Sequence, residues 1–435
     1  MSQPQQLVAT VAIEEPPQTR ISSDQWRSGI AAWLGWTCDG LDMQLYLMVA
    51  QPFVALLLTG SAIVSNPAVI REVNYKSAII QAAFLAGWAL GGALFGRVGD
   101  LLGRARTLSL TIFVYACFTG LSFVAQTWWQ LMIFRFIAAL GIGGEWAVGS
   151  SLLAETWPSR MRPWLAAVLQ SGVNIGVIVA CGVVFALAPY SPRWVFVVGI
   201  VPALLVFWIR RFVPEPEEWQ RARKEDKRDP PNVRLLFVGH IRRTTVLAII
   251  VCAFSLTPWW AFMFWAMPQV RNLPELASWT AAQQQRLATF TLLLLMVFAI
   301  GGNFFGGLLA KLWGFRFAIL GMLVGFFAAM IGTFILPRHH VSLLCWVAIV
   351  GFFSGVFGLF TMYLPPLFPT LLRTTGAGFS YNIGRLAAAA GVIIFGLPAP
   401  GNDFRLMLFY NSFLLIPAML GALLLPEHKS EGPLG

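Results

Sequence analysis

Residues 96–106 read GRVGDLLGRAR, a short charged stretch between two long apolar runs. When the chain is shifted by 211 residues, this stretch lies over GLLAKLWGFRF at 307–317. The glycines that coincide are Gly96 with Gly307 and Gly103 with Gly314. Glycine permits close approach of helices and tight turns. Both stretches are therefore predicted to be turns that connect helices.

The apolar runs around these turns dominate the composition. Hydrophobic residues make up 57% of the 435 residues and charged residues only 11%, and the mean hydropathy is +0.71. A soluble domain needs more polar side chains to cover its surface, so we expect an all-α membrane protein. A crossing takes about 20 apolar residues, and twelve such runs are present. They are 29–58, 77–98, 106–126, 128–152, 164–188, 193–212, 243–267, 287–309, 317–337, 342–365, 377–397 and 404–425.

The shift of 211 residues also matches a second pair of segments. AETWPSRMR at 154–162 lies over PPLFPTLLR at 365–373 without a gap. Two matches at one offset indicate an internal duplication, so the twelve helices should form two pseudo-symmetric six-helix halves. The expected parts are a disordered cytosolic tail (1–26), the first half (27–212), a cytosolic linker (213–241), the second half (242–425) and a cytosolic tail (426–435).

Basic residues are unevenly distributed between the loops. Most of the 30 Lys and Arg residues fall in alternate loops, on the side of the N-terminus. Cytosolic loops carry such an excess, so both termini should be cytosolic and the protein should span the plasma (inner) membrane, as a monomer. This placement argues against a nucleic-acid partner despite the net charge of +11. The basic linker at 213–241 is interpreted as a solvated hinge, with docking to anionic lipid as the alternative.

Cysteine and histidine give no indication of a cofactor. The five cysteines fall singly in separate predicted helices without a CxxC motif, and the four histidines lie in predicted loops or tails. We therefore expect no disulfide, metal or other cofactor, and no histidine that carries a transported proton. An enzyme would need converging nucleophile, base or metal ligands, and the sequence offers no such set.

The turn at 96–106 resembles the loop motif between helices 2 and 3 of the major facilitator superfamily, and the resemblance extends over essentially the whole chain. Leu101 replaces the basic residue usual after the aspartate, and Lys311 takes the place of the aspartate in the second copy. An acid beside arginines at a helix end can form a breakable charge lock, although the arginines could equally serve topology alone. The predicted gating residues are Gly96, Asp100, Gly103, Arg104, Glu145, Glu155 and Arg162. Glu145 is expected near the inner end of its helix and Glu155 just past that end, both paired with Arg104, Arg160 or Arg162.

Four further stretches resemble the organic-acid proton symporters of this superfamily, which include the sialate, lactate and aromatic-acid carriers. They are 24–42, 135–146, 155–180 and 376–385. The resemblance implies a carrier of a small organic anion, without choosing between these acids.

Two aspartates interrupt the first apolar run. Asp39 and Asp42 lie three residues apart on one helix face, roughly 18 Å and 22 Å into the membrane from the cytosolic side. Arg135 of the fourth run is expected at the same level. Two close carboxylates in a poorly hydrated site disfavour double ionisation, so Asp39, Asp42 and Arg135 are predicted to couple transport to a proton. The alternative is that either aspartate only forms an ion pair with Arg135.

Arg385 is predicted to bind the carboxylate of the substrate, because guanidinium forms two parallel hydrogen bonds with a carboxylate. Snorkelling of Arg385 to the cytosolic surface is the alternative. Gln170 and Asn174, one turn apart, are expected to add hydrogen bonds or to connect helices. Tyr363 and Trp265 are expected to contact a flat or small acid. A membrane carrier of a sugar or another neutral or cationic solute, which would share the same superfamily motifs, is the alternative function.

Overall fold

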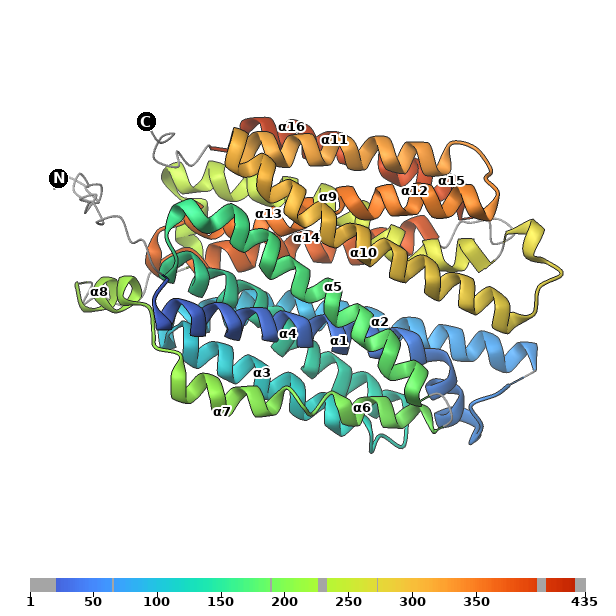
Figure 1. The fold of residues 1–435 in the computed structure, drawn as a ribbon. Coiled ribbons are helices and arrows are strands. Elements are labelled where there is room, and N and C mark those ends of the chain that lie inside the picture. Colours follow the sequence, from blue (N-terminus) through green and yellow to red (C-terminus); the bar gives the residue numbers. More distant parts are fainter. Residues whose placement is uncertain are drawn as a thin grey trace.

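The computed structural model describes residues 21–64, 66–187, 190–225, 233–271, 273–396 and 404–426. Its long elements are helices that lie side by side with their axes roughly aligned (Figure 1). Eleven helical stretches within these residues are long and apolar enough to cross a membrane. The prediction of an all-α membrane protein is confirmed, with about the expected number of crossings. The predicted tails lie largely outside the described residues.

The first half of the chain forms seven helices. They are α1 (Ser23–Thr59), α2 (Pro67–Leu102), α3 (Arg104–Ser122), α4 (Trp128–Thr156), α5 (Arg162–Leu187), α6 (Val195–Val198) and α7 (Ala203–Phe212). α2 begins ten residues before its predicted start at 77, because the side chain of Asn66 accepts a hydrogen bond from the backbone N–H of Ala68 and Pro67 occupies the first position of the helix. The predicted run 193–212 is not one helix. It is interrupted between Gly199 and Pro202, where proline lacks the N–H that a continuous helix needs.

The second half begins after α8 (Glu217–Glu225) and η3 (Val233–Phe237). Its helices are α9 (Gly239–Arg271), α10 (Ala281–Trp313), α11 (Phe315–Phe334), α12 (His340–Phe353), α13 (Val356–Tyr363), α14 (Arg373–Gly396), α15 (Arg405–Ser412) and α16 (Leu415–Leu424). The predicted run 342–365 is also interrupted, between α12 and α13. A Cβ on Gly355 would lie 2.3 Å from the backbone of Gly302, so this break coincides with a very close approach to α10.

The two glycines matched by the offset of 211 residues have the same backbone conformation. Gly103 has φ 105° and ψ 162° between α2 and α3, and Gly314 has φ 83° and ψ 162° between α10 and α11. L-residues rarely adopt these angles. Pro158 and Pro369, also matched by the offset, each precede a short 3-10 helix with nearly equal angles. These local matches support the internal duplication.

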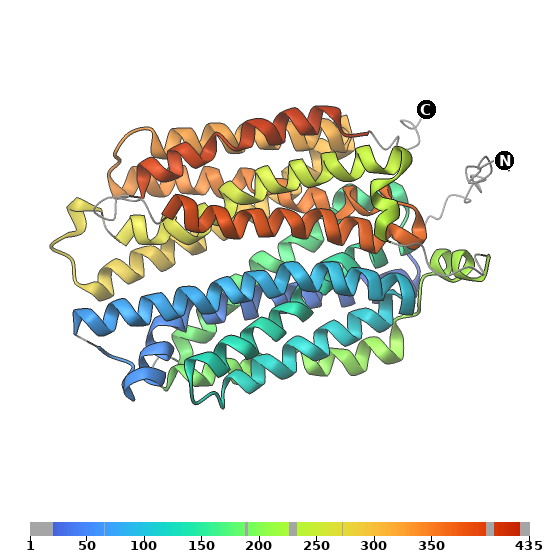
Figure 2. The same cartoon turned by 180° about the vertical axis from the view of Figure 1, so that it is seen from behind.

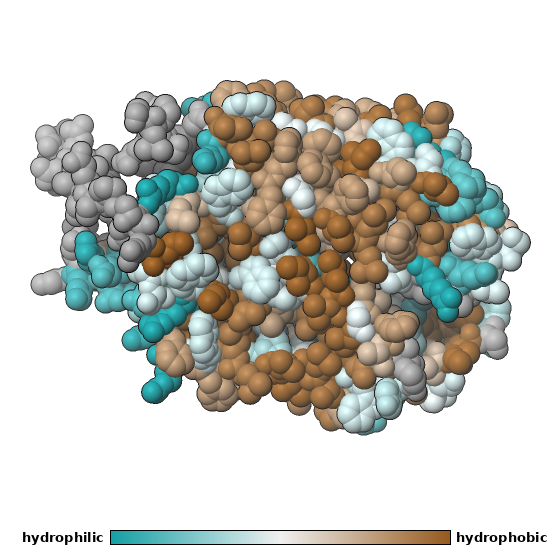
Figure 3. All heavy atoms as spheres, in the orientation of Figure 1, coloured by the Kyte–Doolittle hydropathy of each residue, from teal (hydrophilic) through white to brown (hydrophobic). Residues whose placement is uncertain are grey.

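Two helix pairs bring the halves together. α2 lies along α14, as the reverse view shows (Figure 2), and α5 packs on α10. Within the first half, a Cβ on Gly143 would lie 2.0 Å from the carbonyl oxygen of Trp88, so the glycines of α4 allow α2 to approach closely. On the surface, apolar side chains dominate the middle of the bundle and hydrophilic ones gather towards its ends (Figure 3). This is the surface of a protein that crosses a bilayer.

Candidate functional site

A network of charges joins the two halves at the end of the bundle where α2 meets α3. The buried Arg104 forms ion pairs with Asp100 (3.1 Å) and Glu155 (2.8 Å). Arg373, the first residue of α14, pairs with Glu155 (3.2 Å) and with Glu218 of α8 (2.8 Å). Because Arg104 and Glu155 belong to the first half and Arg373 to the second, the network closes the space between the halves at this end.

Asp100 also acts as an N-terminal cap for α14. Its carboxylate accepts hydrogen bonds from the backbone N–H of Thr375 (2.9 Å) and from the Thr375 hydroxyl (2.5 Å). A Cβ on Gly96 would lie 3.0 Å from the carbonyl oxygen of Thr374, so glycine lets α2 approach α14 here. Arg162 instead donates to the carbonyl of Ala154 (3.1 Å), which holds the turn between α4 and α5.

The linker after α7 is docked on this network. Glu215 accepts hydrogen bonds from the backbone N–H groups of Ala105 (3.1 Å) and Arg106 (2.9 Å) at the start of α3, where a helix favours negative charge. The indole of Trp219 donates to the backbone carbonyl of Asp100 (3.0 Å). The interpretation of 213–241 as a solvated hinge is therefore wrong for this part of the linker.

Asp42 and Arg135 form a buried ion pair between α1 and α4. The Arg135 guanidinium lies 3.0 Å from each carboxylate oxygen of Asp42, and the Thr119 hydroxyl donates to the same carboxylate (2.7 Å). Arg135 also lies over the ring of Phe84, 4.7 Å from its centre. The predicted common depth of Asp42 and Arg135 is confirmed. With this pairing, both charges are balanced inside the first half.

Asp39 instead faces Glu145 of α4, whose side chain is fully buried. Neither oxygen of Glu145 accepts a hydrogen bond from any described residue. A Cβ on Gly35, one turn before Asp39, would lie 1.8 Å from Oε1 of Glu145, so the carboxyl group is pressed against α1. A proton on either acid would let one carboxyl group donate a hydrogen bond to the other.

The predicted place of Glu145 at the gate is therefore wrong. α4 continues to Thr156, eleven residues beyond Glu145, which corresponds to about 16 Å of helix. The predicted helix ended where the apolar run ends, at residue 152, and this placed Glu145 too close to the membrane surface. The arginines expected as its partners lie elsewhere: Arg104 is engaged with Asp100 and Glu155.

A cavity of about 90 Å³ lies between the two halves. α1, α2, α4 and α5 line it from the first half, and α9, α10, α13 and α14 from the second. The lining residues are Trp36, Asp39, Gly40, Met43, Trp88, Trp146, Gln170, Val173, Asn174, Val177, Leu256, Trp259, Trp260, Met263, Met296, Phe357, Tyr381 and Arg385. Aromatic and apolar groups predominate, with few polar side chains among them.

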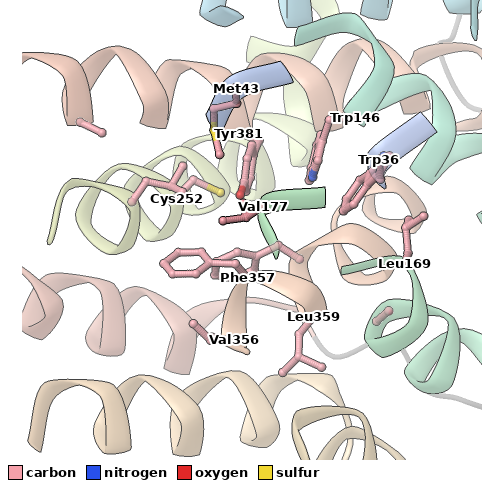
Figure 4. Close-up of a cluster of buried hydrophobic side chains, with 14 of the residues drawn as sticks. Trp36, Met43, Trp146, Leu169, Val177, Cys252, Val356, Phe357, Leu359 and Tyr381 are labelled. Carbon is pink, nitrogen blue, oxygen red and sulfur yellow. The ribbon is translucent and has the colours of Figure 1, made fainter. Parts of the chain in front are cut away.

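Three aromatic rings cross the boundary between the halves beside this cavity (Figure 4). Trp146 of α4 stacks on Tyr381 of α14, with ring centres 4.0 Å apart and planes inclined by 13°. On its other side, Trp146 stacks on Trp36 of α1 at 6.4 Å. All three residues of this row line the cavity.

Arg385 is buried at the cavity, with 4% of its surface exposed. Its guanidinium lies 3.8 Å from the ring centre of Trp88 and 4.8 Å from that of Tyr381. One nitrogen donates to the side-chain oxygen of Asn382 (2.8 Å), and Nε has no hydrogen-bond partner among the described residues. Snorkelling to the surface is therefore excluded for Arg385 in this structure. The charge of Asp39, across the cavity, acts on Arg385.

The family model described as Major Facilitator Superfamily matches residues 33–392. The chain belongs to this superfamily. It is a secondary transporter and not an enzyme. The solved structure of the proton:xylose symporter XylE of E. coli is similar in fold, with a TM-score of 0.72 and 15% identity over 93% of this chain and 96% of XylE.

Two curated relatives of this superfamily member match most of its length. One is a probable 4-methylmuconolactone transporter of Cupriavidus pinatubonensis, 29% identical over 94% of this chain and 92% of the relative. The other is the sialic acid transporter NanX of Escherichia coli, 28% identical over 86% of this chain and 87% of NanX.

Asn174 of this transporter both lines the cavity and links the halves. Its side-chain oxygen accepts a hydrogen bond from Asn303 of α10 (2.9 Å), and its nitrogen lies 3.4 Å from the sulfur of Met296. Gln170, one turn earlier on α5, lines the same cavity. Asn303 was missed in the sequence because a single amide in an apolar helix has no spacing pattern.

Two predicted substrate contacts of the transporter lie away from the cavity. The hydroxyl of Tyr363 donates to the backbone carbonyl of Pro426 (2.6 Å), and Trp265 stacks on Phe404 at 4.5 Å. The break between α12 and α13 turns Phe357 rather than Tyr363 towards the cavity. On α9, Trp259 and Trp260 line the cavity, and Trp265 lies more than one turn beyond them.

Proposed function

We propose that the protein is a proton-coupled symporter that takes up a small organic carboxylate by alternating access. The observation that carries this proposal is a buried guanidinium, Arg385, in a cavity that it shares with the acid Asp39. The proposal includes the predicted topology, which has twelve crossings of the inner membrane and both termini in the cytosol.

The carboxylate would bind to Arg385. A buried cation without an ionised partner is unstable in a membrane protein, and Arg385 is held mainly by aromatic faces and by the neutral amide of Asn382. Its free Nε points to unused donor capacity. An incoming carboxylate would provide both the missing charge and the missing acceptor.

The proton would bind to the pair formed by Asp39 and Glu145. When Asp39 is ionised, its negative charge stabilises Arg385 and competes with the substrate for the same cation. When Asp39 is protonated, Arg385 is left for the substrate. Binding of the proton and binding of the anion thus favour each other, and this reciprocal coupling is the thermodynamic requirement for symport.

The cavity lining favours a flat, unsaturated or aromatic acid. Trp36, Trp146 and Tyr381 line the cavity with aromatic rings, and aromatic surroundings suit planar apolar ligands. A sugar or a sialic acid would require hydrogen bonds for many hydroxyl groups, because unpaired buried polar groups are costly. The cavity has too few polar side chains to pair so many hydroxyl groups. They are Gln170, Asn174, Asp39 and Arg385. The probable 4-methylmuconolactone transporter among the relatives agrees with this choice.

Alternating access would require the charge network to break. Arg373 connects the second half to Glu155 of the first half and to Glu218 of the linker, and Asp100 caps α14 across the same boundary. Release of the substrate at this end would separate these partners. The predicted gating role of Asp100, Arg104 and Glu155 is kept in this proposal.

Uptake into proteoliposomes tests the proposed function. With a gradient of one pH unit, which is about 1.36 kcal/mol per proton, wild-type protein should accumulate benzoate or muconate about tenfold, but neither xylose nor sialic acid. Arg385→Lys should weaken uptake about tenfold, because ammonium lacks the planar fork. Arg405→Gln, which removes an arginine bound to the carbonyl of Phe334 in another part of the second half, is the matched control. Uptake of xylose with the same accumulation would refute the carboxylate proposal.

A further inference from the structure

Three side chains that commonly bind metals meet at the end of the bundle opposite α8. Glu275 lies in η4 (Pro274–Leu276), between α9 and α10, whereas His339 and His340 lie at the start of α12, in segments that Figure 1 places at the same end. Oε2 of Glu275 is 2.8 Å from Nε2 of His339, and Oε1 is 2.7 Å from Nδ1 of His340. The ligand atoms of all three residues lie within 4.8 Å of one another.

We propose that Glu275, His339 and His340 form a binding site for a divalent transition-metal ion of the zinc class. Two imidazoles and one carboxylate are the protein ligands of open zinc sites, in which water takes the fourth position. Bonds of about 2.1 Å place tetrahedral donors roughly 3.4 Å apart. The two carboxylate–imidazole separations of 2.8 Å and 2.7 Å would therefore widen slightly when a metal binds, and no two ligand atoms lie more than 4.8 Å apart before it does. Imidazole selects zinc, copper or nickel over magnesium and calcium, which prefer oxygen.

The surroundings hold the three ligands in place. The backbone N–H of His340 donates to the carboxylate of Glu275, and the ring of His340 packs edge-on against Trp279 at 5.6 Å. Such supporting contacts orient metal ligands and raise affinity. The side chain of His339 is 61% exposed, so water and metal ions reach the site directly.

A bound metal would connect two segments that are distant in the sequence. One follows α9, which carries Trp259, Trp260 and Met263 of the cavity and contains Pro258 and Pro268. The other begins α12. The metal would therefore tether the end of a cavity-lining helix, and transport should be slower when the site is occupied.

Zinc binding to the full-length protein in detergent tests the proposal. The protein is purified with a tag that contains no histidine, and Zn²⁺ is titrated in competition with a chromophoric chelator at neutral pH. We expect one Zn²⁺ per chain in the wild type. Affinity should fall about tenfold or more in His339→Ala and in Glu275→Gln, and an excess of Mg²⁺ or Ca²⁺ should not compete. His240→Ala is the matched control, since residue 240 lies in the first turn of α9 and Glu275 follows the opposite end of this helix.

Equal zinc binding by the wild type and by His339→Ala, or an equal loss in His240→Ala, would overturn the proposed site. His339 is exposed, so His339→Ala should fold normally, and an unchanged melting temperature without metal verifies this. The titration measures metal and not transport, so its outcome is independent of the proposed carboxylate symport.

Discussion

Asp42 and Asp39 lie about one helical turn apart on α1. Asp42 faces a basic residue of α4, Arg135, whereas Asp39 faces an acidic residue of α4, Glu145. Asp42 contacts the guanidinium of Arg135 at 3.0 Å on each oxygen. Asp39 faces the carboxyl group of Glu145, which receives no hydrogen bond from the described residues. The first pair balances its charges and the second does not. We therefore propose different tasks for these two aspartates: Asp42 holds α1 and α4 together, and Asp39 exchanges the coupled proton.

The largest expected effect is a loss of stability when the ion pair between Asp42 and Arg135 is broken. Arg135→Gln would leave Asp42 as a buried anion without a cation, and breaking a buried ion pair costs about 3–5 kcal/mol of stability. Thermal unfolding of the purified protein in detergent measures this loss. The double variant Arg135→Gln/Asp42→Asn should recover most of it, because no unpaired charge remains. Equal stability of the single and double variants would contradict the assigned structural role.

The next effect concerns proton coupling at the unbalanced pair. Asp39→Asn removes the group that competes with the substrate for Arg385, so accumulation should fall from about tenfold per pH unit to none. Exchange of labelled for unlabelled substrate without a gradient should persist. Both are measured in the same proteoliposomes, with the amount of folded protein matched.

Asp42→Asn is the comparison for that experiment. This variant should lower the yield of folded protein, because Arg135 loses its partner, and should affect exchange and accumulation alike. If Asp42→Asn lost accumulation alone and Asp39→Asn did not, the roles of the two aspartates would have to be exchanged.

A smaller effect is expected from crowding Glu145. In Gly35→Ala, the new Cβ would lie 1.8 Å from Oε1 of Glu145. The carboxyl group must therefore leave its position against α1, its alignment with Asp39 is lost, and accumulation should fall several-fold. Adding Glu145→Asp, with a shorter side chain, should restore part of it. Gly149→Ala is the control, since its Cβ would meet its nearest neighbour, Trp36, at 3.5 Å. An equal defect in both glycine variants would indicate general packing damage.

The smallest effect is expected on stability when Glu145 becomes neutral. Glu145→Gln keeps the shape of the side chain and removes a buried acid without a basic partner, so unfolding free energy should stay within about 1 kcal/mol of the wild type. Thermal unfolding of Glu145→Gln and Arg135→Gln, measured side by side, compares the stability of the two variants directly. A loss as large as that of Arg135→Gln would mean that the ionised Glu145 supports the fold.

The sequence by itself determined the helical membrane architecture, because apolar runs of crossing length are a property of composition along the chain. It also predicted the turns at Gly103 and Gly314, since only glycine readily adopts their backbone angles. Arg135 was placed level with Asp42 by helix rise alone. These predictions rest on local geometry that neighbouring helices do not alter.

The partners of the buried charges were decided by the tertiary structure. Sequence spacing placed Asp39 and Asp42 on one face, but the rotation of α4 against α1 decided that one meets Arg135 and the other Glu145. Hydropathy ended α4 too early and so misplaced Glu145, because a helix continues through polar residues wherever its backbone hydrogen bonds do.

The same reason explains why the sequence did not reveal the aromatic residues that line the cavity or the cluster of Glu275, His339 and His340. Trp146 and Tyr381 come from different halves, and Glu275 is separated by 65 residues from His340. Which of many tryptophans line the cavity, and which loops meet, depends on how whole helices pack. That packing minimises unfilled space and unpaired polar groups over the entire bundle, and no single stretch of sequence contains it.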